Sequence, residues 1–95
     1  MKKLEKEFIG TGEVKGFTFE QIMESEKAYL YKVNGDRYEV FFKKEQKAGE
    51  VIISGQKVIF EEKELYPRSE DFGKIAWAYK NYDKALSRFN LITKQ

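Results

Sequence analysis

The 95-residue sequence contains no cysteine and no histidine. Without cysteine, the chain can form no disulfide, no zinc ribbon and no thiol nucleophile. Without histidine, it lacks the commonest transition-metal ligand and the side chain most used in acid–base catalysis. No D-x-[DN]-x-[DN]-G loop is present to hold calcium through oxygen ligands. We therefore expect the protein to bind no metal and no cofactor. Whether it is an enzyme stays open, although these absences favour a protein that is not an enzyme.

Long apolar runs and a dominant charge of one sign are also missing. No segment approaches the roughly 18 apolar residues of a membrane span. The two N-terminal lysines are followed by Glu5, Lys6 and Glu7 rather than by the apolar stretch of a signal peptide. The net charge is only +2, from 18 basic and 16 acidic side chains, so bulk attraction to nucleic acid or anionic lipid is weak. We expect a soluble, cytoplasmic protein that binds no membrane.

Aromatic side chains, by contrast, are abundant. They make up 16% of the chain, with eight phenylalanines, six tyrosines and one tryptophan. Burial of such large side chains offsets the entropy of ordering the chain, so the sequence predicts a folded protein. The length corresponds to one domain over residues 1–95, in which residues 1–16 are either flexible or a short edge strand.

Alternating apolar residues predict a β-hairpin over residues 28–42. An earlier strand covers residues 17–24, where Ile22 breaks the alternation and indicates a bulge or the strand's end. Asn34-Gly35 is a typical type I′ turn, which places Val33 opposite Asp36. This register gathers the apolar side chains on one face and leaves the other face mostly to solvent. The residues of the predicted apolar face are Tyr29, Tyr31, Tyr38, Val40 and Phe42.

A second hairpin is predicted over residues 51–65, after a polar loop at residues 43–49. Gly55-Gln56 fits a type II′ turn, which pairs Ile53 with Val58. Pro67 ends the second strand, because proline cannot donate to a ladder. The nearby carboxylates Glu61, Glu62 and Glu64 indicate an exposed acidic edge rather than a catalytic pair.

The last third of the chain permits two interpretations. In the favoured one, residues 75–79 form a strand and Asn81 caps a helix over residues 82–92. In the other, Ser69 caps one long helix over residues 70–92, and Gly73 counts against it. Both give an α+β fold, a mostly antiparallel meander of four to six strands with one C-terminal helix packed on a face.

No motif specifies a chemical activity. Gly10, Gly12 and Gly16 nearly match a dinucleotide fingerprint, but the spacing is one residue too long and a strand follows. The most favoured function is therefore a non-enzymatic protein-interaction module that binds another protein. Its candidate surface is an exposed patch of Tyr66, Trp77 and Tyr79, since aromatics are enriched at interfaces. A homodimer by edge-strand pairing stays open.

The alternative is weak binding of single-stranded nucleic acid through the basic face of the last helix. Lys80, Lys84 and Arg88 would follow phosphates while Trp77 and Tyr79 stack on bases. The RNP signature of RNA-recognition domains is absent, however.

One pattern supports a resemblance. Tyr66-Pro67, Phe72-Gly73-Lys74, Ala76-Trp77, Tyr79 and Lys84-Ala85 together resemble the C-terminal part of small single-domain proteins of gut bacteria and their phages, a group without an assigned activity. The resemblance covers about a quarter of the chain. It implies a self-contained domain and carries over no catalytic or binding residue.

Overall fold

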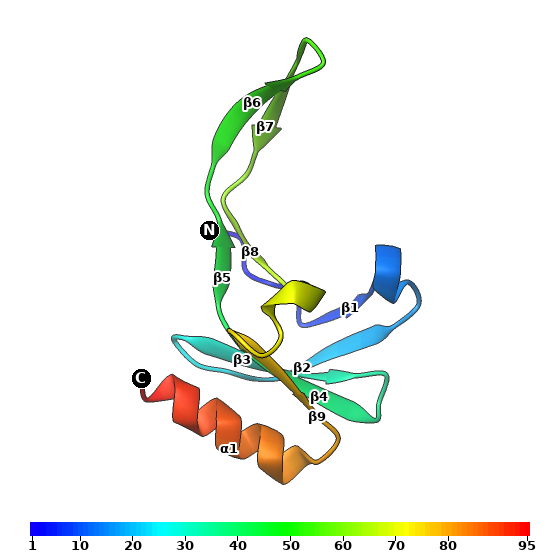
Figure 1. Ribbon diagram of the computed structural model, residues 1–95, viewed down its shortest axis with the longest axis vertical. Coiled ribbons are helices and arrows are strands. Elements are labelled where there is room, and N and C mark those ends of the chain that lie inside the picture. The colour runs from blue at the N-terminus through cyan, green and yellow to red at the C-terminus, as the bar shows by residue number, and fades with distance from the viewer.

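The computed structural model describes residues 1–95 and shows one antiparallel sheet crossed by one helix (Figure 1). The sheet has five strands in the order β1-β2-β3-β4-β9, so β1 and β9 are its edges. The strands are β1 (Glu7–Ile9), β2 (Thr18–Glu24), β3 (Ala28–Val33), β4 (Arg37–Phe42) and β9 (Ala76–Tyr79). The helix is α1 (Tyr82–Thr93), and two short 3-10 turns are η1 (Gly12–Val14) and η2 (Ser69–Asp71). The α+β fold class is therefore confirmed.

Both faces of the sheet are buried. On one face, Leu30 and Val40 pack against Ala85, Phe89 and Ile92 of α1. On the other face, the buried residues form an aromatic cluster, which the N-terminal segment and the segment around η2 cover. That cluster comprises Phe19, Tyr29, Tyr31, Val33, Phe41 and Ala76, with Phe8, Phe17, Tyr66 and Phe72 packed against it. The prediction of a solvent-facing side for the first hairpin is wrong. That side is buried because these distant segments pack on it.

The side chains that share each face also differ from the prediction, and the reason is the turn of the hairpin. Asn34 and Gly35 do adopt positive φ, 55° and 72°, as the sequence predicts. The strands, however, pair Val33 with Arg37 and not with Asp36, so Asp36 is one extra residue in the loop. A shift of one residue moves alternate side chains to the opposite face. Tyr29 and Tyr31 consequently lie with Phe41, while Tyr38 and Val40 lie on the α1 side.

A long β-ribbon, which we call the arm, projects from this body (Figure 1). Its base pairs β5 (Lys44–Gln46) with β8 (Lys63–Leu65), and its tip pairs β6 (Gly49–Ile53) with β7 (Gln56–Phe60). The predicted polar loop at residues 43–49 thus contains a short strand. The radius of gyration is 14.7 Å, against about 12 Å for a compact chain of this length. The arm accounts for the elongated outline of 49 × 31 × 22 Å.

The turn at the end of the arm differs from the predicted one. Ser54 and Gly55 are the two loop residues, with φ of 52° and 77°, and Ile53 pairs with Gln56. The register therefore joins Val51 to Val58, and the predicted Gly55-Gln56 turn is wrong. Ser54 tolerates the left-handed region less well than asparagine or aspartate, which is why the sequence did not indicate a type I′ turn here.

The C-terminal third follows the favoured interpretation. Residues 76–79 form a strand, and Asn81 caps α1 by accepting a hydrogen bond from the Lys84 N–H at 3.1 Å. Gly73 has φ of 91°, which a continuous helix could not contain, so the long-helix alternative is wrong. The irregularity indicated near Ile22 is also present, as a register shift between Gln21 and Met23. The helix is too short and too polar to cross a membrane.

Candidate functional site

The six predicted site residues fall into two groups on opposite faces of the sheet. Trp77 and Tyr79 alternate with Ala76 and Ala78 along β9, and they pack on the α1 side. Tyr66 packs into the aromatic cluster on the other side. The structure therefore brings Trp77, Tyr79 and the basic residues of α1 together, but it does not bring Tyr66 to them.

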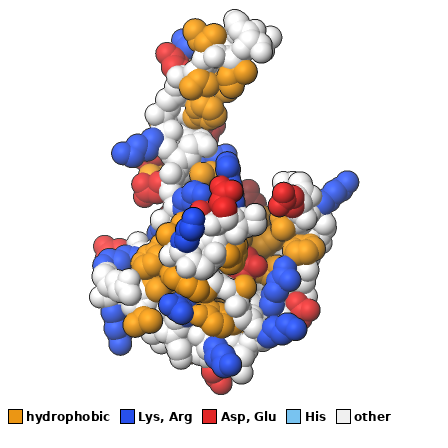
Figure 2. Space-filling model, viewed as in Figure 1, with side chains coloured by type: hydrophobic (Ala, Val, Ile, Leu, Met, Phe, Trp, Pro, Cys, Tyr) orange, Lys and Arg blue, Asp and Glu red, His pale blue; other side chains and the backbone are white.

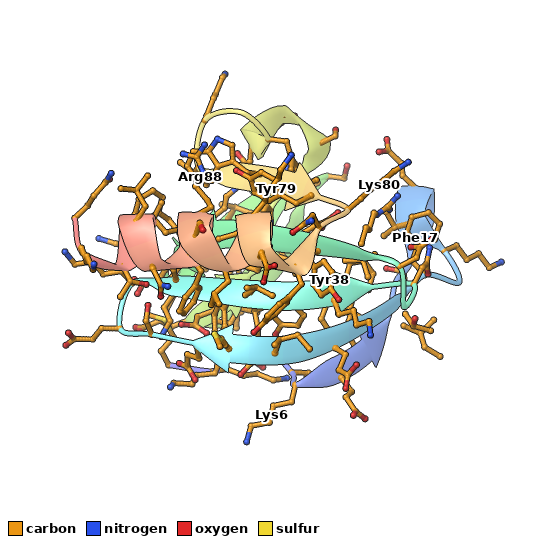
Figure 3. All side chains as sticks on the ribbon, turned by 90° about the horizontal axis from the view of Figure 1, so that it is seen from below. Lys6, Phe17, Tyr38, Tyr79, Lys80 and Arg88 are labelled. Carbon is orange, nitrogen blue, oxygen red and sulfur yellow. The ribbon has the colours of Figure 1, made fainter.

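Trp77, Tyr79 and Arg88 form one contact group between β9 and α1. The Arg88 guanidinium carbon lies 4.5 Å from the centre of the Trp77 ring, and Arg88 Nε donates to the Tyr79 hydroxyl at 2.9 Å. Figure 3 shows Tyr79 and Arg88 side by side beside the helix. Arg88 thereby covers one face of the indole, and a nucleic-acid base cannot stack on that face while Arg88 lies there.

A shallow hollow of about 390 Å³ lies next to this group. It is lined by Tyr79, Asp83, Lys84, Ser87, Arg88 and Leu91. Lys84 is exposed and makes no ion pair, and the same is true of Lys80, which directly follows β9. The hollow consequently carries positive charge, which Asp83 only partly balances.

Tyr66 belongs to a buried polar group on the other face. Its hydroxyl donates to Glu39 Oε1 at 2.7 Å, and Arg37 Nε lies 3.9 Å from Glu39 Oε2. Burial raises the pKa of Glu39 above its usual value, and burial together with the neighbouring carboxylate raises the pKa of Tyr66. Arg37 Nε is itself buried without a hydrogen-bond partner. The group is therefore incompletely satisfied.

This polar group lies at a concave pocket of about 840 Å³ between η1, η2 and the sheet. Aromatic side chains supply much of its wall, and Arg37 lies over the Phe17 ring with its guanidinium carbon 5.2 Å from the ring centre. Sequence reasoning missed the pocket, because the predicted register places Arg37 and Glu39 on the face of the first hairpin that is left mostly to solvent. The lining residues include the hydroxyls of Thr11 and Ser69 and the carboxylates of Glu13, Glu39 and Glu70.

A second buried carboxylate, Glu64, has a structural role. Its Oε1 accepts hydrogen bonds from the Tyr29 hydroxyl and, at 3.1 Å, from the Leu4 N–H. Lys43 Nζ lies 3.9 Å from Oε2. The prediction that Glu64 belongs to an exposed acidic edge is wrong, because β8 turns this side chain toward the sheet, where Tyr29 meets it. Through these contacts Glu64 ties the N-terminal segment and the base of the arm to the core.

The arm tip carries the most prominent exposed apolar surface of the molecule. Ile52, Ile59 and Ile53 are 78%, 72% and 55% exposed. The register places Val51, Ile53, Val58 and Phe60 on one face, while Ile52 and Ile59 share the other with the Glu50–Lys57 ion pair, 3.0 Å long. Figure 2 shows hydrophobic side chains exposed along the projecting ribbon. The sequence signal for this surface is the apolar run Val51–Ile53, which predicts a strand of the second hairpin.

Comparison with protein-family models, with curated proteins and with solved structures finds no match to this chain. The resemblance to small proteins of gut bacteria and phages therefore stays a prediction.

Proposed function

We propose that this protein is a non-enzymatic protein-interaction module whose arm tip binds another protein. The supporting observation is the ribbon of residues 49–60, which has exposed apolar side chains on both of its faces. Exposed apolar patches on small soluble domains mark interaction sites, because their burial in a partner removes apolar surface from water.

The position of this ribbon supports the same function. An isolated two-stranded hairpin is marginally stable in water. No residue of the arm tip belongs to either core cluster, so the body does not stabilise the tip by packing. A partner groove that encloses both faces would supply the missing contacts. The twelve residues of the tip are fewer than the roughly 20–30 per side of a standard interface, which favours insertion into a groove over flat contact.

The test is capture of the tagged protein from a lysate of the cells that produce it, before and after nuclease treatment. Ile59→Asp is compared with Ile9→Asp, because Ile9 on β1 is similarly exposed, at 68% against 72%. Both substitutions add the same charge at a solvent-facing position, so both variants stay folded.

We expect a discrete protein partner that survives nuclease and whose recovery falls at least about tenfold with Ile59→Asp but not with Ile9→Asp. Equal recovery by the two variants would exclude the arm as the binding element. Recovery that disappears with nuclease would instead support the nucleic-acid alternative, which gains little from a tryptophan already covered by Arg88.

A further inference from the structure

Strand β9 has an open edge. The Phe42 N–H donates to the Ile75 carbonyl at 3.0 Å, and β4 pairs with β9 in the register that follows, Val40 with Trp77 and Tyr38 with Tyr79. In an antiparallel pair, alternate residues direct their backbone groups to the same neighbour. Trp77 and Tyr79 are therefore bonded to β4, and the N–H and C=O of Ala78 point to the unpaired side.

Only one end of this edge is covered. The Gly73 N–H donates to the Ala76 carbonyl at 2.7 Å, which protects β9 where it begins. No hydrogen bond of the loops or turns involves the N–H or C=O of Ala78, and the residue is exposed. Native sheets usually cover or charge such an edge, because it is a template for another strand.

The two hollows described above flank this edge, one on each face of the sheet. Ala78 borders the aromatic-walled pocket together with Arg68 and Phe72. Tyr79 borders the basic hollow together with Lys84 and Arg88. Side chains of an added strand alternate between faces, so a residue opposite Ala78 would point toward the pocket and its two neighbours toward the hollow.

We infer that this edge binds an extended acidic peptide segment of a partner protein as a sixth strand. Lys84 and Arg88 line the hollow beside this strand against the carboxylate of Asp83, and the exposed Lys80 directly follows β9. An acidic side chain beside α1 would complement this charge, and an apolar side chain on the other face would enter the pocket next to Phe72. This site is independent of the arm.

Arg88 is already held in place for this role. Its Nε donates to the Tyr79 hydroxyl, and its guanidinium group lies over the Trp77 ring. No hydrogen bond or ion pair of the chain engages its terminal nitrogens. A guanidinium fixed in this way binds a carboxylate at a lower entropic cost. A second copy of the chain fits this edge less well, because pairing β9 with β9 would bring two sets of these cations together.

The test uses a synthetic acetylated peptide amide of sequence Glu-Val-Glu-Phe-Glu and its counterpart with lysine in place of glutamate. Binding is followed by the fluorescence of Trp77, the only tryptophan, and by the NMR shift of the Ala78 amide. We expect the acidic peptide to shift both signals and to bind at least about tenfold more tightly than the basic one, with affinity that falls as salt rises.

Two pairs of variants separate edge binding from general attraction. Ala78→Pro removes the outward N–H, which edge strands tolerate, whereas Ala78→Ser keeps it. Lys84→Glu reverses a charge in the hollow, whereas Lys94→Glu makes the same change at the end of α1. We expect Ala78→Pro and Lys84→Glu each to weaken binding at least about tenfold and the controls to bind as the parent does. A peptide N-methylated at alternate residues tests the same backbone bonds in the unaltered protein.

Several results would overturn this inference. Equal binding of the acidic and basic peptides, or of Ala78→Pro and Ala78→Ser, would exclude strand addition at this edge. A thymidine oligonucleotide that shifts the Ala78 amide when the acidic peptide does not would assign the edge to nucleic acid. Self-association that is lost in Ala78→Pro would assign it to a second copy. Ile59→Asp, the arm variant, should leave peptide binding unchanged, so failure here and failure of the arm proposal are distinguishable.

Discussion

Two glutamates of this protein are buried, and they differ in the groups that surround their carboxylates. Glu64 accepts hydrogen bonds from Tyr29 and Leu4 and lies near Lys43. Glu39 has one hydrogen bond, from Tyr66, and a guanidinium nitrogen at 3.9 Å, beyond hydrogen-bond distance. Burial without full compensation disfavours the charged form and raises the pKa of Glu39.

The Tyr66 hydroxyl is expected to contribute to stability through this carboxylate. Tyr66→Phe leaves the ring packed against Phe8, Phe19 and Phe41 but removes the donor to Glu39. A buried acceptor left without its partner costs about 1–3 kcal/mol, which urea denaturation would measure. As a control, Tyr82→Phe alters a hydroxyl at an exposed position that makes no hydrogen bond and should change stability by less than about 0.5 kcal/mol. Equal changes in the free energy of unfolding for the two variants would show that the hydrogen bond to Glu39 adds nothing to stability.

The Glu39 charge itself should lower stability at neutral pH. Because the folded-state pKa is raised above the value of 4.5, folding favours the protonated form. The contribution of Glu39 to stability is therefore full below pH 4.5 and is lost as pH rises through the folded-state pKa. Glu39→Gln keeps an oxygen that can accept from Tyr66 and carries no charge.

We accordingly expect Glu39→Gln to be more stable than the parent at pH 7, with the difference vanishing below about pH 4.5. Urea denaturation at pH 7 and pH 4 measures it, and Glu13→Gln at the rim of the same pocket provides the control. A variant that is less stable than the parent at pH 7 would mean that attraction to Arg37 outweighs the cost of burial.

At the scale of elements, the arm tip and the central strands should differ in local stability. Strands β3 and β4 pair with neighbours on both sides and are packed on both faces. Strands β6 and β7 pair only with each other, and their side chains contact neither core cluster. Local opening of the tip therefore breaks few apolar contacts.

Hydrogen exchange followed by NMR should show this difference directly. Amides in β6 and β7 should exchange at least about a hundredfold faster than those in β3 and β4, because a lone hairpin is only marginally stable. Amides of α1, whose Phe89 and Ile92 are buried, should be protected like the central strands. Similar protection in the arm tip and the centre would show that the tip is stabilised by contacts other than those of the monomer.

At the scale of the whole molecule, the arm should be removable from the body. Glu64 in β8 anchors the arm's base, whereas residues 47–62 contribute nothing to either core cluster. Since Gln46 pairs with Lys63, a two-residue Asn-Gly loop can replace residues 47–62 and close the shortened hairpin.

This shortened protein should melt within about 8 °C of the parent, which corresponds to about 1 kcal/mol for a domain of this size. Phe89→Ala, which removes a buried ring between α1 and the sheet, should cost about 3–5 kcal/mol and lower the melting temperature far more. Calorimetry compares the two. A shortened protein that fails to fold would show that the arm is part of the cooperative unit.

The sequence by itself determined the local features of this protein. The positive φ of Asn34 and Gly35, the irregularity near Ile22, the strand before Asn81 and the apolar stripe of α1 are all present, because short-range sterics and periodicity set them. The tertiary structure decided what depends on register and on contacts between distant segments. One extra residue, Asp36, turned Glu39 inward to meet Tyr66, and no local pattern records that meeting.

The candidate sites likewise include one that the sequence could predict and others that only the tertiary structure shows. Trp77, Tyr79 and Arg88 could be predicted as a group because β9 and α1 are adjacent in the chain. The open edge at Ala78 could not, because an edge exists only once the order of strands is known. Likewise, the apolar run at Val51–Ile53 predicts a strand, but only the fold shows that the body leaves this strand uncovered. Burial is a property of the whole chain, and alternation along one strand cannot specify it.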